Sequence, residues 1–150
     1  MLYQGECHCG AIGYTYRTEV APEAWPIRSC QCSFCRMHGA HTTSDPVGRV
    51  EFEINEPVSL RHYRFGQHTA DFLLCGHCGG YLGAIVATEG GSFAVVNVNL
   101  LKPYREDLSA PQPMCYDGEN SEDRIQRRAQ RWTPCGGLPA EPALLPKSAP

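Results

Sequence analysis

Several signatures that would assign this chain to a well-known class of protein are missing from its sequence. No uninterrupted apolar stretch approaches the roughly 20 residues that span a bilayer, so we expect no membrane segment. The first residues, Met1 to Cys7, lack a basic segment followed by an apolar stretch, which argues against a secretory signal peptide. A net charge of −3 and an isoelectric point of about 6.0 give no overall attraction to nucleic acid. These absences predict a cytoplasmic protein with no nucleic-acid or membrane partner.

Common catalytic motifs are missing as well. We find no pair of carboxylates at an acid/base spacing, no phosphate-binding glycine loop and no nucleophilic serine motif. Cysteine is the main remaining candidate for a metal ligand or reactive group, with nine residues among 150. Seven of the nine form three tight clusters, Cys7-x-Cys9, Cys30-x-Cys32-x2-Cys35 and Cys75-x2-Cys78.

The clusters favour metal binding over disulfide bonds. Disulfides need an oxidising compartment, and Cys-x-Cys is a poor disulfide pair because both side chains start on one short segment. A structural zinc site takes four protein ligands, whereas a catalytic zinc takes three and keeps one position for water or substrate. Seven cysteines therefore predict one closed zinc site and one open one. Spacing alone does not decide the partners, because Cys32-x2-Cys35 with Cys75-x2-Cys78 would make an equally ordinary four-cysteine site.

Periodicity predicts a mainly β domain with one helix near its end. Residues 49–54 alternate strictly between polar and apolar, and 88–91 contains the glycines of a hairpin turn. A helix is expected from Ser121, as its N-cap, to Trp132, before Thr133-Pro134. We expect one domain over residues 1–135 and a flexible proline-rich tail over 136–150. The other expected strands are 11–17, 60–65, 70–74, 81–87 and 92–101.

Three segments together resemble one family. They are Gly5-Glu-Cys-His-Cys-Gly-Ala-Ile-Gly-Tyr14, then Cys30-Gln-Cys-Ser-Phe-Cys-Arg36 with Gly39-Ala40, then Cys75-Gly-His-Cys-Gly79 with Leu82. In this order they resemble the glutathione-dependent formaldehyde-activating enzyme family, which also contains the centromere protein V domain. The resemblance covers roughly residues 5 to 105. It implies a mainly antiparallel β fold called a β-tent, similar to that of a Rab-binding zinc chaperone, with short helices.

The resemblance also implies two zinc sites and an activity. Cys7, Cys9, Cys75 and Cys78 match the structural zinc ligands of the family, and Cys30, Cys32 and Cys35 match its catalytic zinc ligands. The expected activity is that of a carbon–sulfur lyase like S-(hydroxymethyl)glutathione synthase. Its expected partners are a small thiol such as glutathione and a small aldehyde, joined in an S-hydroxyalkyl adduct.

Two other function classes stay open at this point. One is a non-catalytic zinc scaffold that carries a thiol or binds a protein partner. The other is an enzyme like methionine sulfoxide reductase, which needs a free nucleophilic cysteine. Cys115 is the candidate for that role, although Pro111 to Met114 beside it predicts a loop.

The remaining titratable residues are assigned less specific roles. His8 and His77 lie inside cysteine clusters that already supply two sulfurs each, so we do not expect them to be ligands. His38 and His41 follow the central cluster and are interpreted as ordinary loop histidines or as contacts to substrate. Cys115 and Cys135 are interpreted as free thiols. We expect the four arginines of the terminal helix, Arg124, Arg127, Arg128 and Arg131, to form a solvated face.

Overall fold

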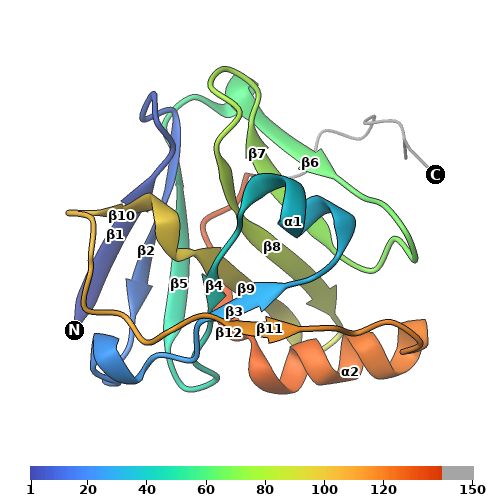
Figure 1. The fold of residues 1–150 in the computed structure, drawn as a ribbon. Helices are drawn as coiled ribbons and strands as arrows, with labels where there is room; N and C mark the ends of the chain where they lie inside the picture. Colours follow the sequence, from blue (N-terminus) through green and yellow to red (C-terminus); the bar gives the residue numbers. More distant parts are fainter. Residues whose placement is uncertain (140–150) are drawn as a thin grey trace.

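The computed structural model describes residues 1–139 of the chain. These residues form a mainly β fold, as predicted, and it contains two α-helices (Figure 1). The strands are β1 Leu2–Glu6, β2 Ile12–Arg17, β3 Arg28–Cys30, β4 Thr42–Thr43, β5 Arg49–Ile54, β6 Leu60–Tyr63, β7 Asp71–Cys75, β8 Tyr81–Thr88, β9 Gly91–Asn97, β10 Leu101–Lys102, β11 Gln112–Met114 and β12 Thr133–Gly136. The helices are α1 Ser33–His38 and α2 Ser121–Arg131, with short 3-10 turns at Pro22–Ala24, Pro57–Ser59 and Val98–Leu100.

The strands form one continuous sheet of mostly antiparallel neighbours. Its main path runs β10-β1-β2-β5-β12-β9-β4-β3-β11, and the β6-β7-β8 meander branches from β9. Two pairs are parallel, β12 with β5 and β11 with β3. Strand β12 therefore lies between β5, which continues the N-terminal strands β1 and β2, and β9.

The strongest periodic signals predicted their strands well. Strand β5 has the predicted bounds, and its apolar face is buried at Val50 and Phe52. The β8–β9 hairpin turns at Thr88 and Gly91, as predicted. The expected strand over 92–101 is wrong in its second half, because β9 ends at Asn97, whose side-chain oxygen accepts a hydrogen bond from Asn99 N and starts a 3-10 turn.

The terminal helix α2 covers the predicted residues, with one correction at its start. The N-cap is Asn120 rather than Ser121, because the Asn120 side chain accepts a hydrogen bond from Asp123 N at 2.8 Å. Trp132 ends the helix in extended conformation, and β12 follows directly. Among the described residues, neither helix combines the length and apolar character needed to cross a bilayer.

The core divides into two clusters that correspond to two parts of the sheet. The larger contains buried residues of β1, β2 and β5, such as Tyr14 and Ile12, and reaches Cys7 and Cys75. The smaller is rich in aromatic residues and surrounds Phe34 of α1. Leu138, in the first part of the expected tail, packs against the larger cluster, and residues 140–150 of that tail lie outside the described residues.

Candidate functional site

Four cysteines from two distant segments meet at one end of the larger core cluster. Cys7 and Cys9 follow β1, while Cys75 ends β7 and Cys78 lies in the turn after it. Their sulfurs all lie within 4.8 Å of one another. We call this group the quartet. Cys7 and Cys75 are fully buried, whereas Cys9 is exposed at the rim.

The quartet has the dimensions of a tetrahedral metal site. Sulfurs that each lie about 2.3 Å from a tetrahedral zinc are about 3.8 Å apart. The Sγ atoms of Cys7 and Cys9 are 3.7 Å apart, and those of Cys9 and Cys75 are 3.6 Å apart. Four sulfurs at this spacing fit a metal that prefers thiolate ligands, and zinc is the usual one.

The backbone around the quartet stabilises negative charge on its sulfurs. Amide groups donate to two of them, from Ile12 N to Cys7 Sγ at 3.5 Å and from Cys78 N to Cys75 Sγ at 3.4 Å. Burial acts to raise the pKa of Cys78, but hydrogen bonds from the backbone and from neighbouring thiols lower it to about 6. Each turn closes on a glycine, Gly10 or Gly79, whose φ of 82° or 81° disfavours a side chain.

Three cysteines from one short segment form a second group. Cys30 ends β3, Cys32 is the N-cap of α1, and Cys35 lies in the first turn of that helix. Their sulfurs also lie within 4.8 Å of one another, and we call this group the trio. Hydrogen bonds from Cys30, Cys35 and the Cys35 backbone amide hold the pKa of the Cys32 thiol far below its ordinary value. Of the three thiols, that of Cys32 is the one whose surroundings favour loss of its proton.

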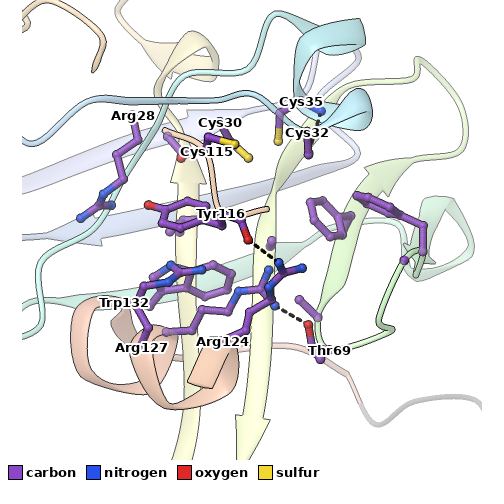
Figure 2. Close-up of a pocket in the computed structure, with 18 of the residues that line it drawn as sticks. Arg28, Cys30, Cys32, Cys35, Thr69, Cys115, Tyr116, Arg124, Arg127 and Trp132 are labelled. Carbon is purple, nitrogen blue, oxygen red and sulfur yellow. Dashed lines mark hydrogen bonds between the residues drawn. The ribbon is translucent and has the colours of Figure 1, made fainter. Parts of the chain in front are cut away.

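The trio differs from the quartet in having an open side. No histidine, carboxylate or further cysteine among residues 1–139 joins it as a fourth ligand. Instead, all three cysteines line a cavity of about 130 Å³. Figure 2 shows the trio on one side of this cavity and Arg124, Arg127 and Trp132 on the opposite side.

An aromatic wall supports the trio and closes one side of the cavity. The Phe34 ring, between Cys32 and Cys35, packs against Phe72 at 4.8 Å and Tyr81 at 5.0 Å between ring centroids. Phe72 and Tyr81 also line the cavity. Burial, together with the nearby cysteines, raises the pKa of Tyr81 well above its ordinary value, so its hydroxyl stays protonated.

The arginines of α2 correct the prediction of a solvated face. Arg124, Arg127 and Arg128 line the cavity, and Arg131 alone of the four is exposed and outside it. The side chains of Arg124 and Arg127 are only 20% and 17% exposed. The sequence analysis did not place these arginines at the site. Arg127 and Arg128 follow Arg124 by three and four positions, so all three share one face of the helix. Arg28 of β3 lines the same cavity and was also not expected there from the sequence.

The other residues considered from the sequence lie outside both groups. His8 and His77 are exposed and belong to neither group, and His38 and His41 do not line the cavity. Cys115 is exposed and lines the cavity without joining the trio. It directly follows β11, a short strand where a loop was predicted. Burial raises the pKa of the Cys135 thiol, a core residue, to about 11.

A family model, one curated protein and one solved structure are similar to this chain. A family model described as "Glutathione-dependent formaldehyde-activating enzyme" matches residues 2–117. A Halomonas elongata protein, provisionally named a glutathione-dependent formaldehyde-activating enzyme, is 44% identical over 36 residues. That match spans 24% of this chain and 21% of the relative. A crystal structure of a Rhodobacter sphaeroides protein is similar with a TM-score of 0.57 and 28% identity, covering 74% of this chain and 99% of that one.

Proposed function

The chain belongs to the glutathione-dependent formaldehyde-activating enzyme family, and from this premise we propose that it is a zinc-dependent carbon–sulfur lyase. Its substrates are a small thiol of the glutathione type and a small aldehyde. The trio holds the reactive metal, and the quartet holds a metal that maintains the fold. Its reaction makes or breaks the S-hydroxyalkyl adduct of thiol and aldehyde.

One observation supports this proposal above the others: the trio supplies three sulfurs and faces a cavity. A metal with four protein ligands has no position for a substrate, whereas one with three has. The quartet surrounds its position from two sides, but the trio comes from a single segment and leaves the cavity side open. The same cavity is large enough to admit a small molecule to that open side.

The charge of the trio favours a sulfur ligand as substrate. Zinc held by Cys30, Cys32 and Cys35 would supply Lewis acidity that lowers the pKa of an entering thiol. Three thiolates leave such a centre with a net charge of −1, which suits thiol binding better than hydroxide formation. Phe72 and Tyr81 give the cavity an apolar wall beside the trio, and Phe34 packs behind that wall.

The reaction balances without any further reactant. The sulfur of the thiol forms a bond to the carbonyl carbon, and the π electrons of the C=O bond move to oxygen. The proton that the thiol loses ends on that oxygen, which gives the S-hydroxyalkyl adduct. In the reverse direction the carbon–sulfur bond breaks and the same proton returns to sulfur.

The test combines a metal count with an exchange measurement. We expect two zinc ions per chain by mass spectrometry in the fully metallated protein and one in Cys32→Ala, with the fold retained. Addition of ¹³C-formaldehyde to glutathione, followed by NMR exchange, should be accelerated by the wild type and return to the uncatalysed rate in Cys32→Ala. The matched control for the metal count is Cys115→Ser, which removes a thiol of the same cavity and should keep both zinc ions.

Two results would count against the proposal. A single zinc ion in the fully metallated wild type would remove the second metal site. Two zinc ions with an exchange rate equal to that of the protein-free reaction would leave a metal-binding scaffold that does not catalyse adduct exchange.

A further inference from the structure

The cavity beside the trio is lined by more positive than negative charge. Four arginines line it, Arg28, Arg124, Arg127 and Arg128, against one carboxylate, Asp117. Three of the four arginines come from α2, beyond the residues that the family model matches. Building on the proposed function, we propose that Arg128 binds a carboxylate of the thiol substrate, so that the enzyme selects a small acid-bearing thiol.

Two of the four arginines already have a partner within the protein. Arg127 makes a two-pronged contact with Glu119, at 2.9 and 3.0 Å, and its guanidinium lies 3.7 Å from the centre of the Tyr116 ring. Arg124 also contacts Glu119, at 3.2 Å, and donates to the Tyr116 carbonyl oxygen at 2.8 Å. These two arginines hold the segment 116–119 against α2, so they are positioning residues.

Arg28 and Arg128 have no such counter-ion. Arg128 donates to the Thr69 hydroxyl at 2.7 Å, and Arg28 donates to the Ser44 hydroxyl at 2.9 Å. Within residues 1–139, neither forms an ion pair with a carboxylate, and the buried Nε of Arg128 has no hydrogen-bond partner. Burial lowers the pKa of Arg128 to about 10, helped by repulsion from its arginine neighbours.

A guanidinium in this state is ready to bind an anion. Burying a charge without a partner is costly, and a ligand anion removes that cost when it binds. Arginine presents its N–H groups in a planar fork that matches the two oxygens of a carboxylate. Trp132, 5.0 Å from the Arg128 guanidinium, limits the space in which this fork can turn.

The size of the cavity sets the size of the ligand. At about 130 Å³ it is smaller than the roughly 300–1,000 Å³ of pockets that hold drug-sized ligands. Only a small molecule, or one end of a larger one, fits between the trio and the arginines. A short carbon chain with sulfur at one end and a carboxylate at the other can contact the trio and an arginine of α2 at the same time.

The experiment compares two thiols that differ only in the group opposite the sulfur, which is a charged carboxylate in one and a neutral amide in the other. Binding of 3-mercaptopropionate and of its neutral amide, 3-mercaptopropionamide, to the zinc-loaded protein is measured by calorimetry. We expect the acid to bind about tenfold to hundredfold more tightly, as for hydrogen bonds to charged groups. Propionate, which has no sulfur, should compete with the acid.

Matched variants assign the preference to particular residues. Arg128→Gln should abolish most of the preference for the acid, because it removes the positive charge that the amide does not need. Arg131→Gln removes an exposed arginine of the same helix and should keep the full preference. Arg128→Lys retains the charge but not the fork, so it should keep part of the preference, and thermal melting checks that each variant is folded.

The outcomes separate this inference from the proposed function. Equal affinity for acid and amide in the wild type would overturn the inference, because the arginines would then only balance the charge of the trio. A preference for the charged over the neutral aldehyde, glyoxylate over formaldehyde, with no preference between the thiols would also overturn it. An arginine-dependent preference in a protein that does not accelerate adduct exchange would support the anion site and contradict the lyase function.

Discussion

The quartet and the trio use the same residue type in two different ways. The quartet joins segments far apart, since Cys9 and Cys75 are separated by 66 positions, and its two buried members belong to the larger core cluster. The trio lies within one stretch of six residues and borders the smaller, aromatic cluster. Sequence separation thus distinguishes a group that joins two distant segments from one that lies on a single segment beside the cavity.

The physical reason lies in what each set of ligands constrains. Joining distant segments reduces the conformational freedom of the unfolded chain, so metal binding there adds to folding stability. Ligands on a single turn close almost no loop, so a metal there adds little to the stability of the whole domain. Under the proposed function, the fourth ligand position at the trio is the one that a substrate occupies.

Replacing one quartet ligand should have the largest effect. Cys75→Ser removes a buried ligand from a site whose metal contributes on the order of 10 kcal/mol in small zinc domains. This is comparable with the roughly 5–15 kcal/mol of total stability of a typical domain. We expect a largely unfolded protein, measured by near-ultraviolet circular dichroism and NMR dispersion.

Cys135→Ala is the control for this variant. It removes a buried cysteine that belongs to neither metal group and should lose only about 1–3 kcal/mol, as for an ordinary core truncation. If Cys75→Ser melted at the same temperature as Cys135→Ala, the quartet would have no special part in the fold.

Removing metal with a chelator should separate the two sites by rate. A metal at the trio would have three protein ligands and face a cavity, whereas one at the quartet would have four ligands, two of them buried. We expect one of two zinc equivalents to leave first, together with adduct exchange, while the folded spectrum persists. Simultaneous release of both equivalents with unfolding would show that the two sites are not independent.

The smallest of these effects concerns β7, which connects both regions. Its end supplies Cys75 to the quartet, while Phe72 within it lines the cavity. At its start, Asp71 pairs with Arg64 and, at 3.3 Å, with His62 Nδ1. Burial acts to raise the pKa of Asp71, but hydrogen bonds from His62 and Arg64 outweigh it and hold this pKa well below its usual range.

Asp71→Asn should cost about 2 kcal/mol at pH 7 and leave both zinc ions bound. Because the pKa is lower in the folded state, the stability from Asp71 is present above its unfolded pKa of about 3.9 and is lost as the pH falls through the folded value. The difference between wild type and variant in urea unfolding should therefore shrink below about pH 4. A difference that stayed constant with pH would contradict the ionic role of Asp71.

Much of this molecule was predictable where a signal was local. The alternation of β5 and the glycines of the β8–β9 turn depend on neighbouring residues alone, and both were predicted. The grouping of seven cysteines followed from their spacing with the help of a family resemblance. Strands β1 and β12 were not predicted. For β12 the reason is that its partners, β5 and β9, are distant in sequence.

The cavity could not be predicted because it depends on contacts between distant segments. From the sequence, the four arginines of α2 were expected to form a solvated face, because nearby carboxylates offset their charge. In the structure Arg124 and Arg127 both contact Glu119, and they line the cavity beside the trio. Helix α1 was also missed, since its six residues are too few for a helical period and its N-cap is a cysteine.

The place of β12 in the sheet has a consequence for how this protein is made. Thr133–Gly136 fills the gap between β5 and β9, so no earlier segment joins these two strands in the described fold. A ribosome releases the chain from its N-terminus, and all seven clustered cysteines precede this strand. The seven clustered cysteines are thus available in a nascent chain before β12, the last strand of the described residues, closes the gap in the sheet.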